Sequence, residues 1–250
     1  QPLIVLATAD EESSMNGARA LAAAGYPKAR AAIIGEPTSL VPVRMHKGIM
    51  MEAVHINGQS GHSSNPSLGN SALDAMHAVM GDLVAFRAQM AARYSNPLFE
   101  VAYPTLNLGC IHGGDSPNRI CGQSELHFDL RMTPAGDNAE VREDIRSRLA
   151  EIGKARGLDI EMRSLIQDVS PFEQDAHSEL VTLAEKLTGQ DAIAVAFATE
   201  APFLQQLGME TIVMGPGSID QAHQPDEFIP LDQIQPAINL LEQFIRHYCL

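Results

Sequence analysis

Residues 3–12 read LIVLATADEE, and this stretch decides the fold that we expect for the N-terminal part of the chain. Its first four residues are apolar, and two adjacent carboxylates, Glu11 and Glu12, end it. A short apolar run is typical of a buried strand, and open α/β sheets place their chemistry beyond the carboxyl ends of strands. We therefore expect a strand over residues 3–8 with acid-base or metal-binding groups at its exit. The alternative is a helix N-terminus, where the helix dipole favours acids.

The order of the following segments predicts two kinds of architecture. A helix at 15–24 and a strand at 31–35 continue a β-α-β pattern, which favours a parallel sheet covered by helices. A strand, helix, strand, strand, helix, strand order then predicts a ferredoxin-like unit. Its segments are expected at 50–57, 71–93, 105–111, 121–131, 139–156 and 158–163. The α/β alternation resumes with helices at 178–187, 200–207 and 231–248 and strands at 193–196 and 211–214.

This order predicts a discontinuous α/β protein. We expect a mainly parallel-sheet domain formed by residues 1–45 and 166–250, with a ferredoxin-like α+β domain inserted at residues 46–165. The chain opens on Gln1-Pro2 and passes at once into the apolar run, so we also expect that an N-terminal portion of the first domain is missing.

Composition excludes several classes of protein. The 250 residues are 45% hydrophobic, enough for a substantial core, and no apolar run approaches the length of a membrane span. The formal net charge of −14, without a basic stretch, argues against nucleic acid as a partner. Three cysteines without CxxC spacing argue against a disulfide framework or a thiolate zinc site, so we expect ordinary buried thiols. We expect a cytoplasmic protein with no membrane partner.

Two further residues have side chains suited to metal binding. Glu36 follows the second predicted strand, in GEPT, and His223 lies in the loop GPGSIDQAHQPDE at 215–227. Each alone is unremarkable, because turn glutamates and solvated loop histidines are common. Together with Glu11 and Glu12, they form the oxygen and imidazole set that zinc or a similar first-row metal accepts.

Four other polar residues lie in turns or at the ends of predicted helices and strands. His62 lies in the polar turn GQSGHSSNP, and Asn118 follows GGDSP. Arg131 ends a predicted strand; its guanidinium matches a carboxylate in shape, although a surface salt bridge would also explain it. Glu200 stands at a predicted helix start, where an acid needs no substrate to explain it.

The ordered set of these motifs resembles the M20 family of metallo-aminoacylases and peptidases from residue 1 to the C-terminus. The motifs are ADEE, GEPT, GHSS, NRIC and GPGSIDQAHQPDE, with YPTLNLG and TEAPF in addition. The resemblance implies a zinc-peptidase-like catalytic domain and an inserted dimerisation domain. It implies Glu11 as the general base, Glu12 and His223 as ligands of one zinc, and Glu36 as a ligand of a second. Two Zn²⁺ ions are implied per complete chain, with Co²⁺ as the alternative metal.

The same resemblance gives roles to the remaining candidates. His62 would reach from the partner of a homodimer to stabilise the oxyanion, and Asn118 and Arg131 would bind the substrate carboxylate. The implied reaction is removal of the acetyl group from N2-acetyl-L-ornithine, an acetylated amino acid of arginine biosynthesis. Glu200 is the candidate partner of the substrate ammonium group. Alternatives are deacetylation of acetylcitrulline, desuccinylation of succinyl-diaminopimelate, and a non-catalytic dimerisation or binding module.

One part of the family pattern is missing from the sequence. The family requires a His-x-Asp motif and a bridging aspartate upstream of ADEE, and neither is present. The sequence His127-Phe128-Asp129 lies inside a predicted strand, so we assign it to structure. Because catalytic zinc generally needs about three protein ligands, we expect this chain alone to be inactive.

Overall fold

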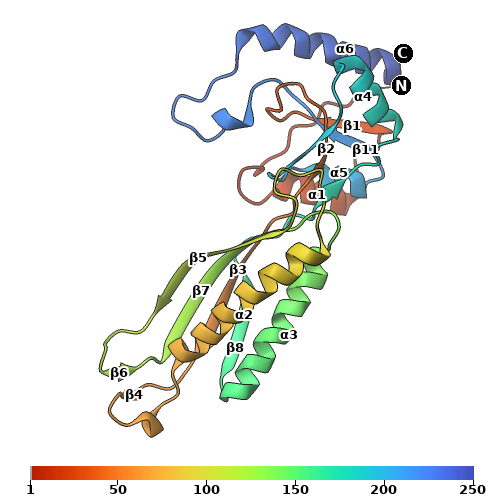
Figure 1. The fold of residues 1–250 in the computed structure, drawn as a ribbon. Coiled ribbons are helices and arrows are strands. Elements are labelled where there is room, and N and C mark those ends of the chain that lie inside the picture. Colours follow the sequence, from red (N-terminus) through yellow and green to blue (C-terminus); the bar gives the residue numbers. More distant parts are fainter. Residues whose placement is uncertain (1) are drawn as a thin grey trace. The chain divides into compact units, whose positions relative to one another are not determined.

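The computed structural model describes residues 2–250 as two compact units (Figure 1). Unit 1 comprises residues 2–46, 98–100 and 172–250, and unit 2 comprises residues 47–97 and 101–171. Unit 1 is therefore discontinuous in sequence.

Unit 1 contains one mixed sheet and four helices. Its strands are β1 (Ala31–Ile34), β2 (Val43–His46), β9 (Phe172–Glu173), β10 (Ile193–Val195) and β11 (Glu210–Val213). Its helices are α1 (Asn16–Ala24), α4 (Glu179–Thr188), α5 (Ala201–Gln206) and α6 (Ile234–Cys249). The sheet order is β1-β11-β2-β10, with β9 paired to β2. Four parallel residue pairs join β1 to β11 and three join β10 to β2, whereas antiparallel pairing is limited to three pairs, so parallel pairing predominates as predicted.

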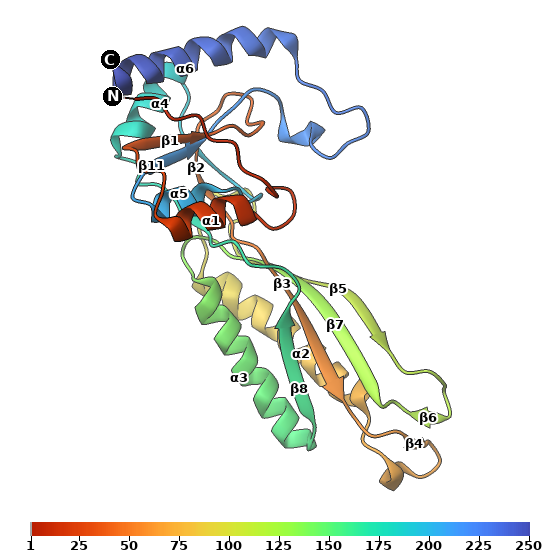
Figure 2. The same ribbon diagram turned by 180° about the vertical axis from the view of Figure 1, so that it is seen from behind.

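Both faces of this sheet are covered by helices, as Figures 1 and 2 show. Successive strand residues point to opposite faces, so neighbouring apolar positions enter different cores. Ile33 and Ile212 pack with α4 and α6, whereas Ile34 and Val213 pack with Ala201 of α5. This double coverage is why the strands are apolar at consecutive positions.

The predicted strand at residues 3–8 is wrong. These residues form no helix or strand, and Leu3 and Val5 are 57% and 87% exposed. An apolar run becomes a strand only where a neighbouring strand completes its backbone hydrogen bonds, and no described strand pairs with this run. The other predicted helices and strands are present with small shifts at their ends.

The sequence interpretation missed strand β2, which lies in the interior of the unit 1 sheet. Its four residues, VRMH, follow Pro42 and contain two basic or titratable side chains, so no apolar run marks them. The strand exists because it pairs with β10, β11 and β9. Its last residue, His46, is fully buried.

Unit 2 has the predicted ferredoxin-like arrangement. Its four-stranded antiparallel sheet has the order β5-β7-β3-β8, formed by Thr105–Gly113, Gln123–Arg131, Met50–Asn57 and Asp159–Ser164. The long helices α2 (Ala72–Arg93) and α3 (Asn138–Arg156) cover one face. A core of alternate strand residues, including Val54, Ile56 and Phe128, packs against these helices. A two-stranded ribbon, β4 (Gly61–His62) with β6 (Arg119–Ile120), accompanies this sheet, and a 3-10 turn (Pro66–Leu68) follows β4.

An ion pair is buried between the sheet and α3 of unit 2. Glu52 on β3 is fully buried and accepts hydrogen bonds from Arg142 Nε at 2.9 Å and Ser164 Oγ at 3.0 Å. Arg142 also lies 3.3 Å from a carboxylate oxygen of Asp168. A charge removed from water needs such partners to remain charged, so this network links β3, β8 and α3.

Two expectations from composition can be compared with the fold. The three cysteines are free, but only Cys121 is buried; Cys110 and Cys249 are half-buried, contrary to the expectation of buried thiols. Among residues 2–250, no helix combines the length and the apolar character that crossing a bilayer requires.

Candidate functional site

The loops that carry Glu36 and His223 lie next to each other in unit 1. Glu36 follows β1 and His223 follows β11, and these two strands are parallel neighbours. The N–H of Thr38 donates to the carbonyl oxygen of Gly215 at 3.2 Å. A Cβ at residue 215 would lie only 2.6 Å from the carbonyl oxygen of Glu36, so the close approach of the two loops requires glycine there.

Glu11 and Glu12 lie in a tight turn before α1. The N–H groups of Ser14 and Met15 donate to the carbonyl oxygen of Asp10 at 3.0 and 2.7 Å. Helix α1 begins at Asn16, has no acidic residue in its first turn and receives no side-chain cap. The two carboxylates therefore do not serve as helix-terminal charges, which removes the alternative interpretation of this motif.

The acidic side chains of unit 1 influence one another electrostatically. Burial, together with three neighbouring carboxylates, raises the pKa of Glu36 to about 7. Those carboxylates belong, in order of effect, to Glu11, Glu12 and Glu200. Burial and the charges of Glu12 and Glu200 also raise the pKa of Glu11, while His223 opposes the rise. The four carboxylates thus share one region of negative potential, which we call the acid cluster.

His223 is the one imidazole among the predicted site residues of unit 1. Its Nε2 lies 3.6 Å from Oε2 of Glu12, and both side chains are exposed. Its backbone has φ of 60°, and its N–H donates to Glu227 Oε2 at 3.2 Å, which holds the loop in this conformation. The structure therefore brings the five predicted site residues of unit 1 into one neighbourhood.

Glu200 differs from the other acids in its burial and its lack of partners. It is only 9% exposed, and its Oε1 is buried without a hydrogen-bond partner among the described residues. Although Glu200 is the N-cap residue of α5, its side chain makes no cap hydrogen bond. A buried carboxylate oxygen without a donor is costly, so a group from outside the described chain is needed to compensate it.

Two predicted site residues, His62 and Asn118, are neighbours in unit 2. His62 on β4 pairs with Arg119 on β6, and the N–H of Ser63 donates to the carbonyl oxygen of Asn118 at 3.0 Å. The N–H of Ser64 donates to Nδ1 of His62 at 3.3 Å. In the neutral ring the proton then resides on Nε2, which leaves Nε2–H as a donor on an exposed side chain.

Arg131 does not lie beside Asn118. Arg131 is the last residue of β7, whereas Asn118 precedes the first residue of that nine-residue strand. The Nε of Arg131 donates to both carboxylate oxygens of Asp129 at 3.0 Å. The expected shared carboxylate site of Arg131 and Asn118 is therefore not formed within unit 2, because a fully extended strand separates them.

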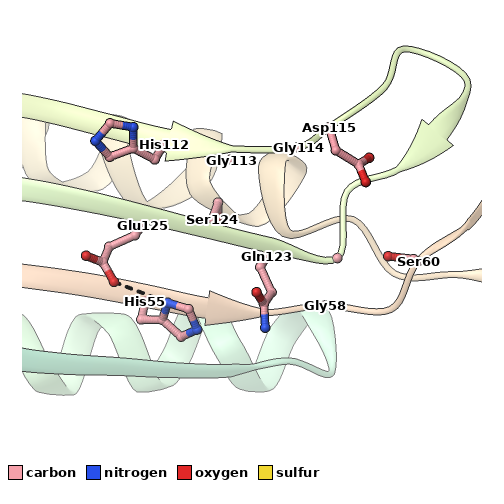
Figure 3. Close-up of a pocket in the computed structure, with 11 residues that line it drawn as sticks. His55, Gly58, Ser60, His112, Gly113, Gly114, Asp115, Gln123, Ser124 and Glu125 are labelled. Atoms are coloured by element: carbon pink, nitrogen blue, oxygen red, sulfur yellow. Dashed lines mark ion pairs between the residues drawn. The ribbon is translucent and has the colours of Figure 1, made fainter.

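Unit 2 also contains a hollow that the sequence interpretation did not predict. It has a volume of about 700 Å³ and lies on the face of the sheet that α2 and α3 leave open (Figure 3). His55, His112 and Glu125 line it from three neighbouring strands. The alternation of polar residues with core residues on β3 and β7 is the sequence signal for this face.

The carboxylate of Glu125 in this hollow already has partners. His55 Nδ1 lies 3.4 Å from Glu125 Oε2, and His127 Nε2 lies 2.6 Å from Glu125 Oε1. The hydrogen bond with His127 lowers the pKa of Glu125. None of the predicted site residues lines the hollow, and the acid cluster with its unpartnered oxygen is the stronger candidate for function.

Comparison with known proteins shows which family the chain resembles. Residues 44–156, which contain the ferredoxin-like fold except for its edge strand β8, match the M20 peptidase dimerisation domain. The chain is 47% identical over 249 residues to acetylornithine deacetylase of Edwardsiella ictaluri (strain 93-146), a match that covers 100% of this chain and 65% of that protein. The chain thus resembles the M20 family, through a dimerisation domain at residues 44–156. Acetylornithine deacetylase of Aliivibrio salmonicida (strain LFI1238) is 45% identical, with 66% of its length covered.

Two solved peptidase structures share the fold of this chain. A tripeptidase from Staphylococcus aureus has a TM-score of 0.72 at 18% identity, covering 96% of this chain and 62% of that one. Aminopeptidase PepT from Bacillus cereus has a TM-score of 0.71 at 20% identity, covering 97% and 63%. At this identity they show the fold alone. The present chain spans about 65% of the length of the curated relatives named above.

The resemblance to M20 peptidases implies a metal, and the donor types and negative charge at this site suit one. Glu12, Glu36 and His223 offer the oxygen and imidazole ligands that zinc prefers. A cation would offset the repulsion that raises the pKa of Glu36. In the described part of the chain, however, no three His, Cys, Asp or Glu side chains gather tightly enough to hold one ion. The donors therefore suit the metal, although they are fewer than a closed site needs.

Sequence reasoning missed one residue beside this site. His46 is fully buried at the end of β2 and accepts a hydrogen bond from the N–H of Thr199, the residue before Glu200. The signal was weak, because His46 lies in a short strand with no apolar run. Only the pairing of β2 with its neighbours reveals its position.

Proposed function

We propose that this protein is a metal-dependent amidohydrolase that removes the acetyl group from N2-acetyl-L-ornithine to give L-ornithine and acetate. The names of the curated relatives support the reaction, and the acid cluster supports the chemistry. The observation that carries the proposal is the buried, unpartnered oxygen of Glu200 beside three other carboxylates. Such an oxygen is suited to the side-chain ammonium group of an acylated diamino acid.

Glu11 is the general base in this proposal. Its carboxylate takes a proton from the attacking water and delivers it to the departing amine nitrogen. Its raised pKa brings the group closer to the operating pH, where a general base is most effective. Glu12 and His223 would hold one divalent metal and Glu36 a second, zinc or cobalt. The bound metal supplies Lewis-acid polarisation of the acyl oxygen and lowers the pKa of water.

We further propose that His62 acts across a homodimer formed through the inserted domain. The match to a dimerisation domain supports the dimer. The free Nε2–H of His62, on an exposed ribbon, suits a donor to the oxyanion of a neighbouring subunit. Asn118 and Arg131 are proposed to bind the substrate carboxylate from separate positions. The domain division 1–45, 46–165 and 166–250 and a cytoplasmic location complete the proposal.

The proposed activity is tested in a chimera. In this chimera, the present chain replaces the matching 65% of the Edwardsiella ictaluri relative. We expect the chimera to release acetate from N2-acetyl-L-ornithine faster than citrulline from acetylcitrulline or succinate from succinyl-diaminopimelate. Preference for one of the latter two would replace the substrate assignment. A well-folded chimera without any of these activities would indicate a non-catalytic dimerisation or binding module.

Replacing Glu200 with glutamine in the chimera should weaken use of the charged substrate selectively. Because a hydrogen bond between charged groups contributes roughly 1.5–3 kcal/mol, KM for N2-acetyl-L-ornithine should rise about tenfold or more. KM for N2-acetyl-L-norvaline, which has the same carbon chain without the ammonium group, should change little. Glu242→Gln, at an exposed position on α6, is the matched control. Equal KM changes for both substrates would remove the role of Glu200.

Zinc content tests the expectation that residues 1–250 alone are inactive. The three candidate ligands Glu12, Glu36 and His223 are divided between two ions, which is fewer than about three ligands for each. We therefore expect fewer than two tightly held zinc ions per chain after dialysis, measured by atomic emission. Two tightly held ions per chain, with acetate release, would refute this expectation.

A further inference from the structure

His46 is a fully buried histidine that contacts the segment carrying Glu200. Its Nε2 accepts a hydrogen bond from the N–H of Thr199 at 3.3 Å. Its ring packs against Phe172, with 5.2 Å between the ring centroids, and the same two residues pair across β2 and β9. The orientation of the imidazole is therefore set by the sheet, and Nε2 must be the unprotonated nitrogen of the ring in order to accept.

Thr199 transmits this constraint to both sides of Glu200. Thr199 is fully buried, and its Oγ1 accepts a hydrogen bond from the N–H of Ala201 at 3.1 Å. The hydroxyl of Thr199 thus satisfies the N–H of the first residue of α5, which then needs no partner from Glu200. Glu200 makes no cap hydrogen bond, and its Oε1 has no partner in the described chain.

We propose that His46 is a positioning residue for substrate selectivity, acting through Thr199. The two hydrogen bonds fix the backbone before and after Glu200. They also occupy the N–H groups of Thr199 and Ala201, so the carboxylate of Glu200 stays available for a cation. This inference rests on the proposed function, in which that cation is the side-chain ammonium of an acylated diamino acid. A ligand-binding group that buried neighbours hold in this way keeps its geometry without help from the ligand.

The test compares two replacements of His46 in the full 250-residue chain. His46→Phe keeps a planar ring against Phe172 but removes the acceptor, whereas His46→Gln keeps an acceptor oxygen at about the position of Nε2. Dissociation constants for N2-acetyl-L-ornithine and N2-acetyl-L-norvaline are measured by calorimetry with Zn²⁺ present. The unmodified chain should prefer the ornithine ligand about tenfold. His46→Phe should reduce this preference at least about threefold, and His46→Gln should retain most of it.

A second readout follows the hydrogen bond itself. The amide hydrogen of Thr199 should exchange faster in His46→Phe than in the unmodified chain or in His46→Gln, because its acceptor is lost. A merely structural role for His46 would weaken binding of both ligands equally and leave their ratio unchanged. That result would overturn the inference while leaving the role of Glu200 intact. Equal binding of both ligands by the unmodified chain would refute the role of Glu200 in substrate selectivity and the inference with it.

A second pair of variants covers the case in which His46→Phe does not fold. Thr199→Val removes the Oγ1 acceptor but preserves the shape of the side chain, and Thr199→Ser restores the hydroxyl. We expect the preference for the ornithine ligand to fall in Thr199→Val and to remain in Thr199→Ser. The same preference in both variants would contradict the positioning role.

Discussion

Replacing Glu11 with glutamine in the chimera is expected to lower kcat for acetate release by about 10²–10⁴-fold, the usual contribution of a positioned general base. Glutamine retains the shape of the side chain but cannot take the proton of the attacking water. Because the substrate contacts assigned to Glu200, Asn118 and Arg131 remain, KM should change little. Steady-state kinetics with N2-acetyl-L-ornithine measures both quantities.

The control for this prediction is another glutamate-to-glutamine change in unit 1. Glu242 is exposed on α6, so Glu242→Gln should leave kcat within about twofold, as surface substitutions usually do. The pH profile gives a second check: the acidic limb that reports the general base should disappear in Glu11→Gln. A variant that retains wild-type kcat would assign the proton transfer to another group.

Replacing Arg142 with methionine is expected to destabilise unit 2 by about 3–5 kcal/mol, the cost of breaking a buried ion pair on one side. Glu52 would then remain fully buried, with the hydroxyl of Ser164 still donating to its carboxylate. The loss should appear as faster amide exchange across β3 and β8, which Glu52 and Ser164 connect. Exchange is the better measurement here, because a chain with two units need not unfold in a single step.

Two matched variants separate the charge effect from the loss of a long side chain. Arg146 lies on the same helix but is half exposed and lies 3.9 Å from Glu143, so Arg146→Met should cost at most about 0.5 kcal/mol. The double variant Glu52→Leu with Arg142→Met should recover most of the lost stability, because apolar replacement of a buried pair is often neutral. A cost for Arg142→Met no larger than for Arg146→Met would show that the pair is not effectively buried.

Sequence patterns predicted unit 2 better than unit 1, and the reason is physical. The strand predicted at residues 50–57 coincides with β3. Apolar and polar residues alternate in it because one face of the sheet packs on the core and the other face is open. The strand at residues 3–8 was wrong and β2 was missed, because both depend on pairing. Within residues 2–250, no strand pairs with Leu3 or Val5, whereas His46 and its neighbours are paired on both sides.

The candidate site was predictable to the extent that it lies in loops after strands. The motifs of Glu11, Glu36 and His223 lie in neighbouring loops of unit 1. What the sequence could not provide was the burial and missing partner of Glu200 or the contact of His46 with Thr199. These properties arise from tertiary packing between segments about 150 residues apart.

The acid cluster also has a consequence for stability without metal. Because the pKa of Glu36 is raised in the folded state to about 7 from its ordinary 4.5, the folded chain binds more protons than the unfolded chain between these values. The contribution of Glu36 to stability is therefore present at low pH and is lost as pH rises through about 7. A bound cation would remove this loss by favouring the carboxylate.

The titration of Glu36 tests most directly whether these carboxylates gather at one place. Its side-chain carboxyl signal can be followed by ¹³C NMR in the metal-free chain, with Glu36→Gln providing the assignment. We predict a midpoint at about pH 7, which falls when Glu11 is replaced by glutamine and when Zn²⁺ is added. A midpoint near the ordinary value of 4.5, unaffected by Glu11→Gln or by Zn²⁺, would contradict the acid cluster and the function built on it.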